Sequence, residues 1–259
     1  MTATNDRTKW FPYSYSEKKS DIIYMNQILN CLDEYGCGTK DSCEHNPKWK
    51  MFNFNEYFTK DRYDFLTMGC SVSYGSEIKK SQTWRYDLSN TIDLSVPGIG
   101  IDGIWHNLKC LLSQDKIIFD KIIVLLPNLA RRTFRIHKDN HWFNFIATKN
   151  SEQPRHANFA FRPDEMKKLN DRHVRFLVLH GERYGRLILE RFIKWINRSQ
   201  IRGLFLSSWD DDVYRMLKDR VVKATVLEKF EEGYQKIPGI HHPSPEAHKK
   251  WLRDITHIL

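Results

Sequence analysis

Apolar runs and amphipathic segments alternate along the chain from about residue 63 to the C-terminus. The clearest buried strand is the uninterrupted β-branched run KIIVLL at 121–126. Similar runs bounded by turn residues predict further strands at 64–68, 91–96, 203–208 and 221–227. Apolar residues at helical spacing and helix-start residues predict helices at 81–89, 103–112, 163–198, 210–218 and 245–258.

This alternation defines the fold class that we expect. Strands that alternate with helices form a parallel sheet with helices on both faces. We therefore predict one three-layer α/β/α domain with a mostly parallel, flavodoxin-like central sheet over residues 61–259. Residues 137–162 have little periodicity and many aromatic and histidine residues, so we interpret them as an insertion in this domain. We interpret residues 1–60 as an N-terminal extension packed on the domain, with one helix near 21–32.

Length and composition are those of a folded globular protein. The chain has 259 residues, of which 41% are apolar and 28% charged, so it can bury a full core. No apolar run approaches the roughly 18 residues that a membrane span needs, and we expect no membrane association. The N-terminal segment has no apolar signal core. We therefore expect a cytoplasmic protein without a signal peptide, or a virion component if the protein comes from a phage.

The five cysteines favour reduced thiols over disulfides, because their number is odd and no secretion signal is visible. Cys31, Cys37, Cys43 and His45 are a candidate zinc-ligand set. Their spacings are wider than those of the usual zinc knuckle, so ordinary thiols are the preferred interpretation. The prediction is a protein without a metal or other cofactor.

Basic residues outnumber acidic ones, and the formal net charge is +9 at pH 7. Much of this excess lies between residues 162 and 202. Such a charge favours polyanionic partners such as nucleic acid, acidic glycan or an acidic protein surface. A solvated amphipathic helix explains the same residues and is the preferred interpretation.

Four residues with chemical potential each follow a predicted strand, where ligands bind in parallel α/β sheets. Ser71 follows the first strand and can act as a nucleophile. Gly98 follows the second strand, where its N–H can face an oxyanion, and Asn128 follows the third with an amide that can do the same. His242 lies in a proline-rich loop after the last strand and can act as the base.

This order of serine, glycine, asparagine and histidine resembles the SGNH/GDSL hydrolase family, in its phage and bacterial branch. The sequence from Gly69-Cys70-Ser71 to Gly75 resembles the first block of the family, and 93–98 resembles the second. Asn128 matches the third block at its asparagine alone, and His242-Pro243 matches the last. The resemblance implies a Ser71 nucleophile, a His242 base and an oxyanion hole formed by Ser71, Gly98 and Asn128.

Two positions depart from the family pattern. Cys70 stands where the family has the first-block aspartate, and Gly239 stands where it has the catalytic acid. The sequence leaves several replacements for this acid open: a backbone carbonyl, or a carboxylate from Asp210, Asp211, Asp212, Glu228, Glu231 or Glu232. A site without activity is also compatible with Gly239.

Three functions follow, in order of preference. The first is a serine esterase or acyl hydrolase acting on a small-molecule or glycan ester such as an acetylated carbohydrate. The second is an inactive SGNH-fold protein that interacts with a protein partner in an assembly, such as a phage particle. The third, least favoured, is nucleic-acid binding through the basic stretch at 162–202.

Overall fold

The computed structural model describes residues 22–24, 50–52, 58–75, 78–96, 98–113, 117–136, 141–146, 171–231 and 242–259. Its centre is a sheet of five strands: β3 (Arg62–Gly69), β4 (Thr91–Asp93), β5 (Ile118–Leu126), β8 (Leu204–Ser208) and β9 (Thr225–Val226). The strands lie in the order β4-β3-β5-β8-β9, and every neighbouring pair is parallel. This is the 2-1-3-4-5 order of flavodoxin-like folds, so the predicted fold class is confirmed.

The two central strands form the middle of the core. β3 pairs with β5 from Arg62↔Ile118 to Gly69↔Leu125. Every residue from Ile122 to Leu126 is buried, as is expected for a parallel strand covered on both faces. The run of β-branched and leucine residues at 121–126 therefore predicted this strand correctly.

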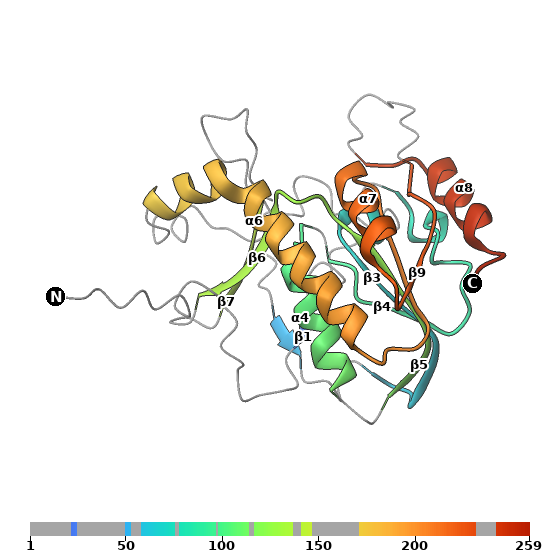
Figure 1. Cartoon of the computed structure of the whole chain (residues 1–259). Helices are drawn as coiled ribbons and strands as arrows, with labels where there is room; N and C mark the ends of the chain where they lie inside the picture. Colours follow the sequence, from blue (N-terminus) through green and yellow to red (C-terminus); the bar gives the residue numbers. More distant parts are fainter. Residues whose placement is uncertain are drawn as a thin grey trace.

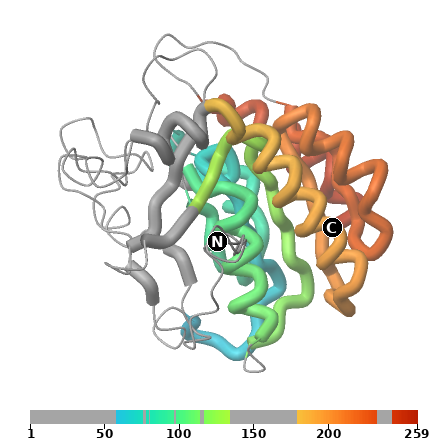
Figure 2. The backbone as a smooth tube through the Cα atoms, turned by 60° about the vertical axis from the view of Figure 1, so that its left-hand side comes forward, coloured from blue at the N-terminus to red at the C-terminus, as the bar shows by residue number. Residues whose placement is uncertain are grey.

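Helices cover both faces of the sheet (Figures 1 and 2). On one face α4 (Ile101–Leu112) packs beside α6 (Asp171–Arg198), which in turn contacts α7 (Asp211–Arg220). On the other face α8 (Pro245–Ile255) packs against the 3₁₀ helix η3 (Lys80–Gln82). Right-handed crossovers between parallel strands produce these two helical layers.

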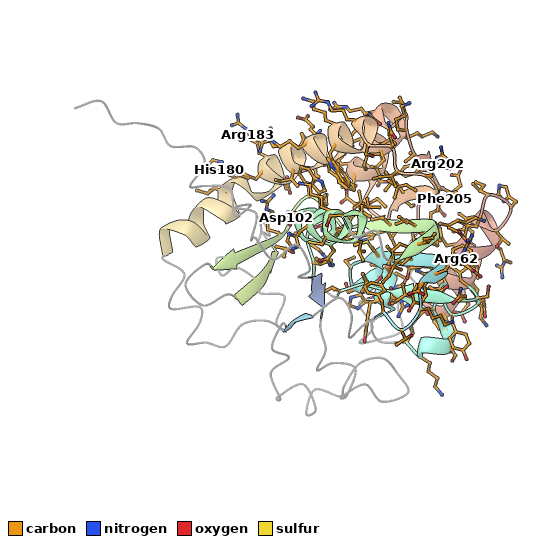
Figure 3. The ribbon with its side chains drawn as sticks, turned by 90° about the horizontal axis from the view of Figure 1, so that it is seen from below. Arg62, Asp102, His180, Arg183, Arg202 and Phe205 are labelled. Atoms are coloured by element: carbon orange, nitrogen blue, oxygen red, sulfur yellow. The ribbon has the colours of Figure 1, made fainter. Side chains whose placement is uncertain are left out.

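Helix α6 is amphipathic and ends at Arg198, as the periodicity predicts. Its inner side buries Ile188, Phe192 and Ile196, while its outer side exposes basic residues such as Arg183. Figure 3 shows Arg183 and His180 on the outer surface of this helix. Within the described ranges no helix combines the length and the apolar character needed to cross a membrane.

Two other helices start where the sequence indicates. The Asp210 carboxylate caps α7 by accepting from the Val213 N–H at 3.0 Å. Ser244 caps α8 in the same way, with Pro245 as the first helical residue. The predicted helices at 210–218 and 245–258 are therefore confirmed, with ends that differ by a few residues.

The predicted helix at 81–89 is wrong. Only Lys80–Gln82 is helical, as a single 3₁₀ turn, and the chain then continues in turns to Asn90. Trp84 is fully buried in this segment, with its ring centroid 4.9 Å from that of Trp251 on α8. Burial of this indole against α8 outweighs the weak helical pattern of the segment.

The predicted helix near 21–32 is also wrong in its first part. Ile22–Tyr24 forms the strand β1, which pairs antiparallel with β2 (Lys50–Phe52) and lies against α4. Isoleucine and tyrosine favour strands, and pairing with a second strand satisfies their backbone groups. Residues 25–32 lie outside the described part of the chain.

The interpreted insertion at 137–162 coincides in part with a hairpin that starts earlier. Strand β6 (Arg131–Ile136) pairs antiparallel with β7 (His141–Ile146), from Arg131↔Ile146 to Ile136↔His141. Residues 137–140 and 147–170 are not described, and the predicted helix start at 163 lies among them.

Candidate active site

The candidate site lies where the chain reverses its direction across the sheet. From β3 the chain passes outwards to β4, and from β4 it returns to β5 on the other side of β3. In doubly wound sheets this switch point leaves a crevice beyond the carboxyl ends of the two central strands, where ligands bind. Ser71 follows β3 and Asn128 follows β5, so both lie at the switch point between these strands.

Ser71 is the first residue of the short helix α3 (Ser71–Tyr74). The strand before it ends at Gly69, where a Cβ would overlap the Ser73 side chain. The helix ends at Gly75, whose φ of 73° is a left-handed conformation that favours glycine. Glycines on both sides of Ser71 therefore allow the tight turn from strand to helix.

Ser71 is 5% exposed, and its Oγ accepts a hydrogen bond from Arg131 Nη1 at 3.2 Å. The structure therefore gives the Ser71 hydroxyl a cationic neighbour, which the sequence analysis did not foresee. A hydroxyl that accepts a hydrogen bond from a guanidinium can still donate its own proton. The Ser71 hydroxyl therefore keeps the proton that a general base would remove.

Arg131 is a site residue that the sequence analysis missed. It starts β6, shortly after the end of β5 at Leu126. Its guanidinium lies over the Trp209 ring, 5.5 Å from the centroid, and the Trp209 Nε1–H lies 3.4 Å from Cys70 Sγ. Residues that follow β3, β5 and β8 are thus joined by side-chain contacts at one edge of the sheet.

Asn128 lies in a turn closed by a hydrogen bond from the Arg131 N–H to its carbonyl, at 3.3 Å. Its side-chain Oδ1 is buried and has no hydrogen-bond partner within the described part of the chain. The next residue, Leu129, rests with its carbonyl against Gly185 of α6, where any Cβ would overlap the oxygen. Close packing on α6 therefore fixes the turn that carries both Asn128 and Arg131.

Gly98 follows β4 at the same edge of the sheet. The Ile99 N–H donates to the Val96 carbonyl at 3.1 Å, and Gly98 within this turn has a φ of 80°. A type II turn requires a positive φ at this position, and glycine is the residue that adopts it most readily. Gly98 is a buried turn residue beside the strand that leads to Ser71.

His242 is half-buried and lies just before α8. A helix that follows a parallel strand in this fold runs back along the sheet, so α8 begins at the carboxyl edge. The charge of His242 is close enough to lower the pKa of His248 on that helix. The structure therefore places His242 just before α8, close enough to His248 for their charges to interact.

A network of polar contacts connects the segment after Ser71 to β3 and β4. Arg85 donates to the Ser73 carbonyl and forms an ion pair with Asp93 at 2.8 Å. Asp93 also accepts from Thr67 Oγ1 at 2.8 Å. This network, which the sequence analysis did not identify, holds the chain after Ser71 against β3 and β4.

His248 is a core residue and not a second catalytic base. It is fully buried, and its Nδ1 accepts from the Trp84 N–H at 3.4 Å. Burial, with smaller contributions from the charges of Arg85 and His242, lowers its pKa from 6.5 to about 3. The ring is therefore neutral at physiological pH.

The three carboxylates at the start of α7 each have a polar partner close to the helix. Asp210 caps the helix, and burial raises its pKa. Asp211 forms an ion pair with Lys229, which lowers the pKa of this carboxyl, and Asp212 forms one with Arg215. All three follow β8 at the edge that the sequence predicts, but Asp211 is paired with the segment after β9 and Asp212 is paired along the surface of α7.

The other acid candidates lie between β9 and α8. Glu228 is exposed and accepts from Tyr214 Oη at 3.5 Å, and Glu231 forms an ion pair with Lys250. Glu232 and Gly239 lie outside the described residues. Glu228 therefore contacts α7 and Glu231 contacts α8. Neither of these contacts is with a histidine, as the acid of a triad would require.

The metal candidates Cys31, Cys37, Cys43 and His45 are all outside the described residues. In the part that is described, no group of three or more histidine, cysteine or acidic residues is arranged to hold a metal ion. Cys70 is buried next to Trp209, and the Cys110 Sγ lies 3.5 Å from His106 Nε2.

A second charged pair lies next to the site. Asp102 on α4 is 1% exposed and lies 3.1 Å from Arg132 Nη2 (Figure 3 labels Asp102). Its Oδ1 accepts from the Thr133 N–H at 2.8 Å. Burial raises the pKa of Asp102, and the charge of Arg132 opposes this rise. The pair joins α4 to β6 and leaves Arg131, the preceding residue, facing Ser71.

Comparison with known proteins adds no family to this description. No model of a protein family matches the chain, and no curated protein matches it. The residues at the carboxyl edge of the sheet are therefore the features that indicate a function.

Proposed function

We propose that the protein is a serine hydrolase of the SGNH/GDSL type that cleaves a carboxylic ester. The observation that carries this proposal is the position of Ser71, which follows the first strand of a 2-1-3-4-5 sheet, opposite Asn128 at the switch point. Gly98 follows β4 at the same edge, and the proposal places His242, just before α8, at this edge as well. The proposed site contains the four residue types of the family in the same order along the chain.

In the proposed mechanism, Ser71 Oγ attacks the ester carbonyl and His242 accepts its proton. His242 then donates this proton to the leaving alcohol. The Ser71 and Gly98 N–H groups and the Asn128 amide stabilise the oxyanion of the tetrahedral intermediate. One such donor contributes about 3 kcal/mol to transition-state stabilisation. Water then hydrolyses the acyl-enzyme by the reverse sequence of proton transfers.

The site works as a Ser71–His242 dyad in this proposal. Gly239 at the acid position does not prevent proton transfer itself, because the acid of a triad orients the imidazole and stabilises its charged form. Loss of that group lowers kcat by about 10⁴ where the remaining geometry survives. We therefore expect slow turnover, and acetylated carbohydrate is the substrate class that the family resemblance suggests.

An active-site-directed fluorophosphonate probe tests the proposal. We expect the probe to label the full chain, and the label to disappear in Ser71→Ala. Ser73→Ala is the matched control, because Ser73 is a nearby buried serine whose Oγ is bonded to Ser95 Oγ at 2.9 Å. His242→Asn is expected to slow labelling by at least about 10²-fold.

Two outcomes contradict the proposal. One is a folded wild-type protein that takes up no probe, and the other is labelling that persists in Ser71→Ala at the wild-type rate. Either result favours the alternative function, a catalytically inactive fold that binds a partner. The observation on the side of that alternative is Gly239 at the acid position, together with α7 carboxylates that are engaged elsewhere.

A further inference from the structure

Arg131 places a positive charge next to Ser71, and no carboxylate among the described residues neutralises it. Its partners there are both uncharged: the Ser71 hydroxyl at 3.2 Å and the Trp209 ring, with the centroid at 5.5 Å. The Nε atom is buried, and no described residue forms a hydrogen bond with it. A partly buried guanidinium in this state is incompletely satisfied by the protein itself.

Two nearby arginines, Arg132 and Arg85, have a structural role, and each is paired with an acid. Arg132, the next residue, forms an ion pair with the buried Asp102 at 3.1 Å. Arg85 forms an ion pair with Asp93 at 2.8 Å. Both lie in the core with acids beside them, whereas Arg131 lies at the ligand-binding edge of the sheet without one among the described residues. Packing alone therefore does not account for the charge at position 131.

We infer that Arg131 binds an anionic oxygen group of the substrate, so that the ester cleaved at Ser71 carries a carboxylate or phosphate close to the scissile bond. This inference rests on the proposed function and specifies its substrate class. Arginine suits such a role because its planar guanidinium matches carboxylate and phosphate oxygens, and stacking on an indole holds it in place.

The distance between Arg131 and Ser71 sets how close that anionic group is to the ester. When Ser71 Oγ attacks, the acyl carbon comes within bonding distance of an atom that already lies 3.2 Å from Arg131 Nη1. A carboxylate or phosphate a few bonds from that carbon reaches the same guanidinium. Hemiesters of dicarboxylic acids and acyl groups next to the charge of an acidic sugar have this arrangement, whereas a neutral acetylated sugar does not.

The role of Arg131 is to bind substrate, so its test needs no turnover. Succinate is titrated into the full-chain Ser71→Ala protein by calorimetry, with inorganic phosphate as a second probe and neutral succinamide as the uncharged counterpart. We expect binding of succinate or phosphate and none of succinamide. Arg131→Gln, combined with Ser71→Ala, should weaken this binding about ten- to hundredfold, because one charge-assisted contact is lost. The probe that binds more tightly identifies the anion.

Arg202→Gln is the matched control. It removes the same charge from an exposed arginine just before β8, at the amino edge of the sheet (Figure 3). Binding that survives Arg131→Gln, or that falls equally in Arg202→Gln, overturns the inference because it reports only the net positive charge of the protein. Absence of binding of both anions to the Ser71→Ala protein overturns it as well.

A second measurement uses the wild-type protein and no variant. Phenylglyoxal modifies accessible guanidinium groups, and the peptide that contains residue 131 is followed by mass spectrometry. Succinate or phosphate should slow modification of Arg131 about tenfold or more and leave that of Arg202 unchanged; equal rates with and without the anion overturn the inference. The fluorophosphonate experiment tests Ser71 separately, so labelling without anion binding refutes the Arg131 role alone, and anion binding without labelling refutes the hydrolase proposal alone.

Discussion

The buried ring of His248 makes the fold sensitive to acid. In the folded protein the pKa of this histidine is about 3, whereas its ordinary value is 6.5. Between these two values the unfolded chain binds a proton that the folded protein excludes, so stability falls as the pH decreases below about 6.5. From about pH 7.5 to about pH 5, the two pKa values give a loss of about 2 kcal/mol from this one group.

Urea unfolding of the wild type and of His248→Asn, at the two pH values, measures this loss. Asparagine keeps an acceptor for the Trp84 N–H but cannot be protonated, so the variant lacks this part of the pH dependence. The variant is less stable at both pH values because it leaves space beside Phe230. The stability difference between wild type and variant should therefore shrink by about 2 kcal/mol on acidification.

The control is His257→Asn, which changes an exposed histidine near the C-terminus and should retain the wild-type pH dependence. Titration of the other groups, including the buried Asp102, is common to wild type and variant and cancels in the comparison. Parallel stability curves for the wild type and His248→Asn between the two pH values would refute the reasoning. So would a wild type that gains stability relative to the variant in acid.

Three further substitutions test the packing around the site, each by urea unfolding at neutral pH. Asp102→Asn should cost about 3 kcal/mol, because it leaves the buried Arg132 guanidinium without its counter-charge; a change below about 1 kcal/mol contradicts the pairing. Gly185→Ala should cost about 2 kcal/mol or more, because its Cβ overlaps the Leu129 carbonyl, and a neutral effect would mean that the contact is loose. Asp210→Ala should cost about 1 kcal/mol through the lost helix cap, with an exposed change on the same helix as the reference.

The fold class was predictable because its signals are local and repeated. The run at 121–126, the caps at Asp210 and Ser244 and the period of α6 each depend on a few neighbouring residues. Parallel strands joined by helices then allow few arrangements. The prediction was wrong where a tertiary contact decides the local structure, as for Trp84, which leaves a helical conformation to pack on Trp251.

The candidate site was predictable only where a residue directly follows a strand. This rule selected Ser71, Gly98 and Asn128 as candidates, because position along the chain gives position at the sheet edge. It missed Arg131, which starts a hairpin strand and reaches Ser71 across 60 residues of sequence. It also missed the contact between Trp209 and Cys70, which are 139 residues apart. Spacing in one sequence does not indicate which side chains meet across such separations.

The separations along the chain between Ser71, Arg131 and Trp209 set the order in which the residues of the candidate site emerge during synthesis. Ser71 emerges early, Arg131 follows 60 residues later and Trp209 later still, and His242 arrives only with the segment before α8. A domain generally folds as a unit, so the site is complete only after the C-terminal part of the domain has been synthesised. A nascent or truncated chain that ends before β8 contains Ser71 and Arg131 but lacks Trp209 and His242, so the proposed hydrolase predicts no labelling of Ser71 in such a chain.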